Sequence, residues 1–236
     1  MRGRVIAIDG PSASGKSSTA RAVAEALGFA HLDSGALYRG VTLVALRESA
    51  RRGRKHGDPL DVLDPETVLR AAEDRGLMLQ PDGAGFAAYL EGEPVDPELR
   101  GARVTGCVSA VSAVPVIREW INTRLRAMVR AGRDVVVDGR DIGTVVFPDA
   151  DLKIFLTASP SARAGRRINQ RGAAVDPTLL EAEAAALAAR DHADSTRHTA
   201  PLKPAEDAVL LDTTALDFAE QVERIVALAR PILARR

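Results

Sequence analysis

Short β-branched apolar runs alternate with longer stretches of helical periodicity along most of the chain. The apolar runs predict buried strands over five segments, 5–8, 29–32, 134–137, 152–156 and 208–211. The intervening patterns predict helices over about 16–27, 36–50, 160–170, 177–193 and 218–234. Strands that alternate with helices are typical of a doubly wound sheet. We therefore predict the α/β class, with a five-stranded parallel sheet.

The residues between the second and third strands form a segment far longer than one crossover needs. Segment 34–133 is therefore predicted to be an inserted lobe, with 1–33 and 134–236 as the core domain. Within the lobe, a proline and two glycines lie between short apolar runs at 77–94. This pattern predicts a hairpin, as part of a small antiparallel insert at about 64–96.

Proline marks the expected beginnings of several helices. A capping residue precedes proline at Asp64–Pro65, Asp96–Pro97, Ser159–Pro160 and Asp176–Pro177. Another helix is expected to begin near Pro115. The alanine-rich run 181–190 is read as helix and not as a linker, because alanine is the strongest helix former.

Composition narrows the class of protein. The 236 residues include 32 Lys and Arg and 32 Asp and Glu, so the formal net charge is zero. This balance argues against a general binder of nucleic-acid polymers or anionic membranes. We find no apolar run long enough to span a bilayer. The single cysteine, Cys107, excludes an internal disulfide and a cysteine-based zinc cluster, and indicates a reducing, cytoplasmic setting.

The clearest motif follows the first predicted strand. Residues 10–17, GPSASGKS, fit the pattern G-x-x-x-x-G-K-[ST] and lead into a predicted helix. Glycines let the backbone curl so that its N–H groups face phosphate oxygens, and the helix N-terminus favours negative charge. The alternative is a glycine- and serine-rich turn with a surface lysine. The motif predicts a nucleoside triphosphate site in this phosphate loop.

The predicted roles within the loop follow from the side chains. Lys16 reaches the β- and γ-phosphates, and the Ser17 hydroxyl can bind Mg²⁺. Asp33, at the end of the second strand, is the second candidate Mg²⁺ ligand. The full set assigned to ATP is Gly10, Pro11, Ser12, Ala13, Ser14, Gly15, Lys16, Ser17 and Ser18.

Three further groups could serve an acceptor of the phosphoryl group, because ligands bind at the carboxyl ends of parallel strands. Asp33 and Ser34 end the second strand, with Arg39 in the helix that follows; a plain helix cap is the alternative. The segment DGRDIG, residues 138–143, follows the third strand, and a salt-bridged turn is the alternative to an acceptor site there. Arg190, Asp194 and Arg197 have helical spacing, and could form a surface ion-pair ladder.

Other P-loop classes fit less well. A GTPase would carry an Asn-Lys-x-Asp motif after a later strand, and 134–216 contains none. A large ATPase motor is normally longer. A small phosphotransferase with an arginine-rich acceptor site is the class that remains.

Five segments, in order, resemble the bacterial-type cytidylate kinases of the nucleoside monophosphate kinase group. They are GPSASGKSS (10–18), LDSGALYRG (32–40), VDGRDIGTVVFPDA (137–150), KIFLTAS (153–159) and RDHADSTR (190–197). The resemblance covers essentially the whole chain. Ser17–Ser18 departs from the Gly-Thr or Ser-Thr of many relatives, but both side chains keep a hydroxyl. The resemblance implies a P-loop kinase core that transfers phosphate from ATP, with Mg²⁺, to CMP or dCMP.

The resemblance also implies roles for individual residues in the acceptor site. Arg39, Arg140 and Arg197 would bind the acceptor phosphate, with Arg190 close by, and Asp194 the ribose hydroxyls. Ser109, Arg118 and Asp141 would face the cytosine edge, where Asp141 accepts from the amino group and Arg118 donates to N3 and O2. An exposed Arg118 and a packing Ser109 are the alternative. The complete substrate-binding set is Ser34, Arg39, Ser109, Arg118, Arg140, Asp141, Arg190, Asp194 and Arg197.

Segment 159–177 is predicted to be a short lid. It carries four arginines, Arg163, Arg166, Arg167 and Arg171. A solvated basic helix face is the alternative to closure over the phosphates. The predicted catalytic set is Lys16, Arg140, Arg163 and Arg166.

Two other functions stay open. The chain could be a P-loop kinase for another small acceptor, such as UMP, AMP or shikimate, or a nucleotide-dependent regulatory switch. If the chain phosphorylates CMP or dCMP, we expect it to bind ATP and that acceptor, and to be a monomer.

Overall fold

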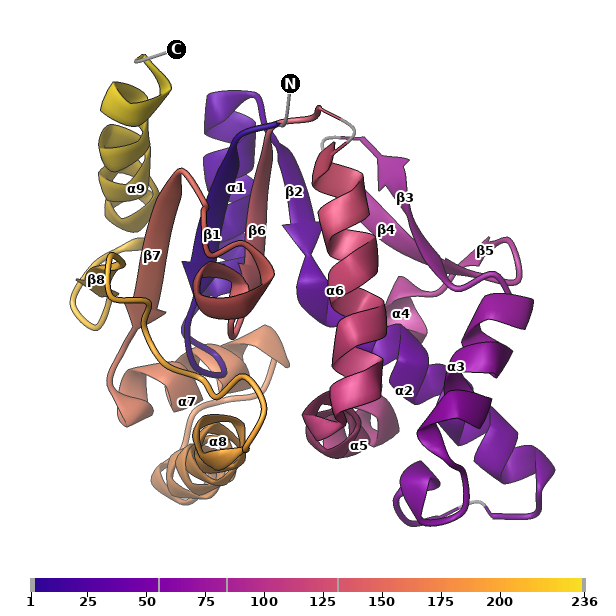
Figure 1. Ribbon diagram of the computed structural model, residues 1–236. Helices are drawn as coiled ribbons and strands as arrows, with labels where there is room; N and C mark the ends of the chain where they lie inside the picture. The colour runs from indigo at the N-terminus through magenta and orange to yellow at the C-terminus, as the bar shows by residue number, and fades with distance from the viewer. Residues whose placement is uncertain (1–2, 55, 84, 131, 235–236) are drawn as a thin grey trace. The chain divides into compact units, whose positions relative to one another are not determined.

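The computed structural model describes residues 3–54, 56–83, 85–130 and 132–234 (Figure 1). The chain divides into two compact units. Unit 1 comprises Met1–Leu32 with Val129–Arg236, and unit 2 comprises Asp33–Met128.

Unit 1 is built on a sheet with the strand order β2-β6-β1-β7-β8. Its strands are β1 (Val5–Asp9), β2 (Ala30–Asp33), β6 (Val135–Gly139), β7 (Leu152–Thr157) and β8 (Val209–Asp212). β1 pairs with β6 and β7 in parallel, and β7 pairs with β8 in parallel. Each of the five predicted strands is present, and the predicted α/β class is confirmed.

The inner strands are apolar because helices cover both faces of a parallel sheet. The predicted burial of the last strand is wrong, because only Leu211 of β8 is buried. Every residue of β1 and β6 is buried. Ile6, Ile8 and Ile154 form one hydrophobic cluster with Val23 of α1 (Lys16–Leu27) and Ile225 of α9 (Phe218–Leu233). The core therefore fixes the carboxyl ends of the strands, from which the phosphate loop departs.

The remaining helices of unit 1 are α7 (Pro160–Gln170), α8 (Pro177–Thr196) and the short π-helix η2 (Ile142–Val146). α7 and α8 lie beyond the carboxyl ends of the strands (Figure 1). Ser159 caps α7 by accepting from the Ala162 N–H at 3.2 Å, and Asp176 caps α8 by accepting from the Leu179 N–H at 2.9 Å. Both predicted proline starts are confirmed.

Unit 2 holds most of the long insertion. Its elements are α2 (Ser34–Arg51), η1 (Pro59–Asp61), α3 (Pro65–Asp74), β3 (Met78–Asp82), β4 (Gly85–Leu90), β5 (Glu93–Pro94), α4 (Asp96–Leu99), α5 (Ala102–Ala113) and α6 (Pro115–Arg130), whose last residues belong to unit 1. β4 pairs with β3 and β5 in antiparallel fashion, which confirms the predicted hairpin.

One predicted cap in unit 2 is wrong. Asp96 is the first residue of α4 and not its cap; Val95 holds that position without a side-chain bond. α4 contains only 4 residues, and a second helix, α5, follows from Ala102. Gly101, with an extended conformation (φ −60°, ψ 154°), separates the two helices.

Within the described ranges, no single helix is long and apolar enough to cross a membrane. The helices α5 and α6, which meet at a sharp bend, are together long and apolar enough to do so, but the core helices of soluble proteins often are as well.

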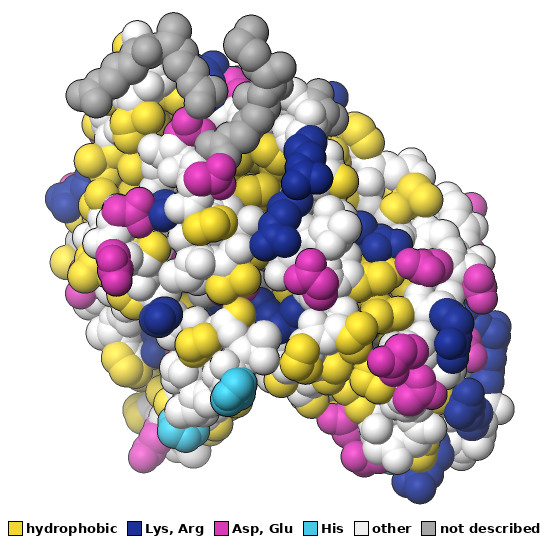
Figure 2. Space-filling view, viewed as in Figure 1, with side chains coloured by type: hydrophobic (Ala, Val, Ile, Leu, Met, Phe, Trp, Pro, Cys, Tyr) yellow, Lys and Arg dark blue, Asp and Glu magenta, His cyan; other side chains and the backbone are white. Residues whose placement is uncertain are grey.

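Basic and acidic side chains are interspersed on the face drawn in Figure 2.

Candidate active site

The phosphate loop runs from the end of β1 into α1, and two glycines make its path possible. A Cβ at Gly10 would lie 2.1 Å from the Leu156 carbonyl oxygen, so no other residue allows this approach to β7. Gly15 has φ 91° and directly precedes the first residue of α1, Lys16. The loop therefore ends at a helix N-terminus, as a phosphate cradle requires.

Lys16 folds back over the loop. Its side chain is buried, and Nζ donates to the Pro11 carbonyl at 3.1 Å. The ammonium group therefore lies at the loop that it is predicted to serve.

Asp138 is a candidate metal ligand, although the sequence analysis considered it only as part of the strand-end group 138–143. The Ser17 hydroxyl donates to one of its carboxylate oxygens at 2.5 Å, and His31 Nε2 lies 2.8 Å from the other. Burial alone would raise the pKa of Asp138, but the contacts with His31, the charge of Lys16 and the Ser17 bond hold it below its usual range. In the parallel pairing of β1 with β6, Asp138 lies opposite Ile8, two residues before the phosphate loop begins. Knowledge of the strand register would therefore have predicted that Asp138 lies beside the loop.

A hydroxyl and a carboxylate suit Mg²⁺, which prefers oxygen ligands. Ser17 and Asp138 fit this role together. Asp33, the predicted second ligand, lies in unit 2 at the N-cap of α2 without a side-chain cap bond. Its role as a ligand stays a prediction.

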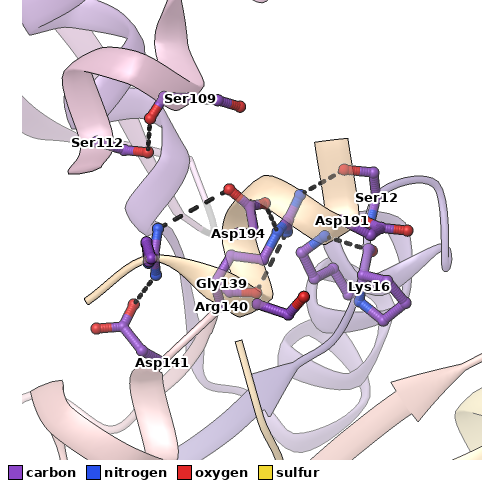
Figure 3. Close-up of polar contacts among 12 residues, drawn as sticks. Ser12, Lys16, Ser109, Ser112, Gly139, Arg140, Asp141, Asp191 and Asp194 are labelled. Atoms are coloured by element: carbon purple, nitrogen blue, oxygen red, sulfur yellow. Dashed lines mark hydrogen bonds and ion pairs between the residues drawn. The ribbon is translucent and has the colours of Figure 1, made fainter. Parts of the chain in front are cut away.

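Every polar group of Ser12 binds a side chain from another part of unit 1 (Figure 3). Its N–H donates to Asp191 Oδ1 at 2.8 Å, and its carbonyl accepts from Arg163 Nη1 at 2.9 Å. Its hydroxyl oxygen accepts from Arg140 Nη2 at 3.0 Å. The phosphate loop is thus bonded to the end of β6 and to the helices α7 and α8.

Four of the predicted acceptor residues form a charged chain that begins at Arg140. Arg140 Nε donates to Asp194 Oδ2 at 3.0 Å. Arg197 lies between two acids, with Nη1 3.9 Å from Asp194 Oδ1 and Nη2 3.7 Å from Asp141 Oδ1. The side chains of Asp194 and Arg197 are each 6% exposed, so a surface ion-pair ladder is the wrong interpretation.

Arg197 reaches these acids because α8 ends one residue earlier, at Thr196. The Arg197 backbone is extended, with φ −60° and ψ 142°, and its Nε donates to the Ala200 carbonyl at 2.7 Å. The expected helical face therefore stops at Asp194. Arg190 lies one turn before Asp194 on α8, and its predicted role near the acceptor phosphate is untested.

Asp9, the last residue of β1, was also missed. It is buried and accepts from the Ile142 N–H at 2.8 Å and the Gly143 N–H at 2.7 Å. Burial raises the pKa of Asp9 to about 7. The two N–H bonds and the charge of Lys16 lower this pKa, whereas the charge of Asp141 raises it further. Asp9 thus fixes the turn that follows Asp141.

The arginines of the predicted lid divide into two groups. Arg163 is buried and pairs with Asp191, while its Nε donates to the Ala158 carbonyl at 3.1 Å. Arg166 donates to the Ser14 carbonyl at 3.3 Å. Arg167 instead donates to Gln170, within α7, and Arg171 donates to Glu183 of α8. Arg163 and Arg166 therefore hold the phosphate loop in this structure, and their catalytic role stays a prediction.

A pocket of about 350 Å³ opens beside the phosphate loop within unit 1. It is lined by Ala13, Gly15, Ser18, Arg166, Arg167, Gln170, Leu216, Phe218 and Gln221. Phe218, at the first position of α9, is 53% exposed. Neither Leu216, which is partly buried against the core, nor Phe218 was singled out from the sequence, because single apolar residues carry no motif.

The other predicted acceptor residues lie in unit 2. Arg118 is 2% exposed, so the alternative of an exposed arginine is wrong. Its Nη1 donates to the Ser112 carbonyl at 2.8 Å, and its guanidinium lies 5.3 Å from the centre of the Tyr38 ring. The Ser109 carbonyl accepts from the Ser112 hydroxyl at 3.0 Å.

Arg39 and Ser34 are both on α2. Arg39 Nη1 donates to the Leu99 carbonyl and the Thr105 hydroxyl, each at 3.0 Å, and Ser34 is buried. The predicted cytosine-edge set is divided, with Ser109 and Arg118 in unit 2 and Asp141 in unit 1. As a set it stays a prediction. In the parts of the chain that the structure describes, no group of three or more His, Cys, Asp or Glu residues could hold a metal ion.

Comparison with known proteins identifies the family of the chain. The family model described as "Cytidylate kinase" matches residues 6–231. The chain is 44% identical to a cytidylate kinase of Rhodococcus opacus (strain B4) over 94% of this chain and 93% of that protein. It is 44% identical to the enzyme of Mycolicibacterium paratuberculosis, over 96% and 95%, and 42% identical to that of Geobacillus kaustophilus, over 96% of each. The match of the family model and of these relatives along nearly the whole sequence shows that this chain belongs to the cytidylate kinase family.

Proposed function

We propose that the chain catalyses ATP-dependent phosphorylation of CMP and dCMP, giving ADP with CDP or dCDP. The observation that carries this proposal is the junction at Ser12, where the phosphate loop meets Arg140 and, through it, Asp194 and Arg197. In a member of the cytidylate kinase family, this junction brings a donor site and an acceptor site together.

On the donor side, the loop N–H groups and Lys16 bind the ATP phosphates. Mg²⁺, held by Ser17 and Asp138, would neutralise charge on the β- and γ-phosphates. The pocket beside Ala13 and Phe218 has room for the adenosine part. Its aromatic ring and the Arg166 and Arg167 guanidinium groups offer flat surfaces on which a purine can stack.

On the acceptor side, Arg140 and Arg197 bind the phosphate of CMP, with Arg39 from unit 2. Guanidinium groups suit this role because they donate in pairs to a dianionic phosphate. Asp194 accepts from the ribose hydroxyls, and Ser34 and Arg190 complete the set. An oxygen of the acceptor phosphate attacks the γ-phosphorus as its bond to the bridging oxygen of ADP breaks. The attacking oxygen is already ionised, so no general base is needed.

Base selection rests on Asp141, Ser109 and Arg118. Cytosine presents an amino donor beside the acceptors N3 and O2, which a carboxylate and a guanidinium complement. Uracil has an acceptor at O4 and a donor at N3, so both contacts become repulsive. A site built on such bonds discriminates strongly, because the wrong base leaves buried polar groups unpaired.

A coupled ADP-release assay against CMP, dCMP, UMP, AMP and shikimate tests the proposal. We expect prompt turnover that depends on CMP or dCMP and on Mg²⁺. Equal or faster turnover with another acceptor would assign that acceptor in place of CMP. Slow ADP release that no acceptor stimulates would favour a regulatory switch.

Several properties of the chain stay predictions. They are a cytoplasmic location, a monomeric state, and the absence of nucleic-acid polymers and membranes among its partners. Sedimentation at several protein concentrations checks the monomer.

A further inference from the structure

Ser12 belongs to the phosphate loop by sequence, but its side chain binds the acceptor side. Its backbone N–H and carbonyl are held by Asp191 and Arg163, whereas its hydroxyl oxygen accepts from Arg140 at 3.0 Å (Figure 3). The two sets of contacts are separable, because replacing the side chain leaves the backbone bonds in place.

The Ser12 hydroxyl is one of three oxygens that surround the Arg140 guanidinium. Nε donates to Asp194 Oδ2 at 3.0 Å, Nη2 to Ser12 at 3.0 Å, and Nη1 to the Gly139 carbonyl at 3.4 Å. A guanidinium has five N–H groups, so these three bonds fix its plane and leave donors for an anion. Ser12 is 3% exposed, whereas the Arg140 side chain is 17% exposed. The fixed side of the guanidinium is therefore buried, and solvent reaches the rest.

We propose that Ser12 is a positioning residue for the acceptor nucleotide: its hydroxyl sets the orientation of Arg140, so this residue of the ATP loop acts on CMP. The inference rests on the proposed function, since it takes Arg140 as a ligand of the acceptor phosphate. If the Ser12 hydroxyl served ATP alone, its removal would instead weaken binding of the donor nucleotide.

Calorimetric binding of CMP alone and of ADP alone separates these roles. For Ser12→Ala we expect CMP affinity to fall about tenfold, near the effect of one lost hydrogen bond to a charged group, with ADP affinity changed less than about twofold. Ser12→Thr keeps the hydroxyl and should restore most of the loss. Ser195→Ala, which removes an exposed hydroxyl on α8, is the matched control and should bind both nucleotides normally.

A double variant tests whether the effect passes through Arg140. Arg140→Lys removes the planar fork, so adding Ser12→Ala to it should weaken CMP binding by less than about twofold further. Fully additive losses would overturn the proposal, as would unchanged CMP affinity in Ser12→Ala or an equal loss of ADP affinity. Absence of CMP binding by the wild-type protein would instead overturn the proposed function, and this inference with it. Thermal melting of each variant confirms that it is folded.

Discussion

The predicted acceptor residues of the two units are held in different ways. In unit 1, Arg140 and Arg197 each bind one main-chain carbonyl, but they also share the Asp194 carboxylate, and Arg140 binds the Ser12 side chain of the phosphate loop. In unit 2, the contacts described for Arg39 and Arg118 include main-chain carbonyls, those of Leu99 and Ser112. A side chain held by other side chains moves when one of them is replaced, whereas a carbonyl of the helical backbone remains.

This difference predicts how substitutions combine. Within the unit 1 chain, effects should be strongly non-additive, because each residue shares partners with the next. Substitutions at Arg39 and Arg118 should act more locally. The following experiments test that contrast, beginning with the largest expected effect.

Lys16→Ala should abolish most of the transfer while leaving the fold intact. The Lys16 ammonium donates to a carbonyl of its own loop, so its removal leaves the arginine–carboxylate chain in place. Loss of a contact made mainly in the transition state costs about 3–4 kcal/mol, or about 10²–10³ in rate. Steady-state kinetics measures this, with thermal melting as the check on folding. Near-normal turnover would contradict the assignment of the phosphate loop.

Arg118→Met should lower kcat/KM for CMP by about 10²-fold, near the ~3 kcal/mol upper limit for a hydrogen bond to a charged group. The preference for CMP over UMP should shrink, and KM for ATP should stay nearly constant. Arg124→Met is a matched control on the same helix, because Arg124 stacks on Trp120 at 3.4 Å and its side chain is 36% exposed. A variant at Arg118 with wild-type base preference would contradict this account of specificity.

Asp191→Asn should destabilise unit 1. Asp191 pairs with the buried Arg163 and accepts from the Ser12 N–H, and its side chain is 16% exposed. The substitution leaves a mostly buried guanidinium without its carboxylate, for which we expect a loss of about 2 kcal/mol in the free energy of unfolding. Urea unfolding measures it. Glu66→Gln, on the exposed first turn of α3, is the control and should change stability little.

The contrast also explains what the sequence could and could not predict. The positions of the core strands followed from short apolar runs, because burial on both faces makes a parallel strand apolar throughout. The phosphate loop was predicted from the fixed spacing of its two glycines, Lys16 and Ser17 between a strand and a helix. These features depend on neighbours in sequence.

The missed residues depend on neighbours in space. Asp138 gains its role from strand register, which sets it opposite Ile8. Asp191 lies within the segment 190–197, but no role was assigned to it, because its partner Ser12 is far from it in sequence. The partner of Asp9, Ile142, is also far from it in sequence. The four arginines of the predicted lid could not be told apart from the sequence, and α7 brings two of them, Arg163 and Arg166, against loop carbonyls. A run of arginines gives no sign of whether its carbonyl partners lie within reach.

The last prediction is a change in the pH dependence of stability, and it concerns Asp9, which anchors the turn beside Asp141. Its pKa is raised from 3.8 to about 7 in the folded chain. Between these values the folded state keeps a proton that the unfolded chain has released. The stabilisation is therefore complete below about pH 4 and is lost as the pH rises through about 7. Over that interval the free energy of unfolding should fall by at most about 1.4 kcal/mol per pH unit from this group.

Asp9→Asn removes the titrating group, so its stability should depend less on pH than that of the wild type. Urea unfolding at about pH 5, 6 and 7 measures the difference in slope, and comparison with the wild type cancels the other titrating groups. Asp207→Asn is the control, because the bond from Lys153 lowers the pKa of Asp207 and keeps its titration below this window. Parallel slopes for Asp9→Asn and the wild type would show that Asp9 is ionised throughout. In that case the Ile142 and Gly143 N–H bonds, which favour the carboxylate, outweigh its burial, and the anchor beside Asp141 is a permanent charge.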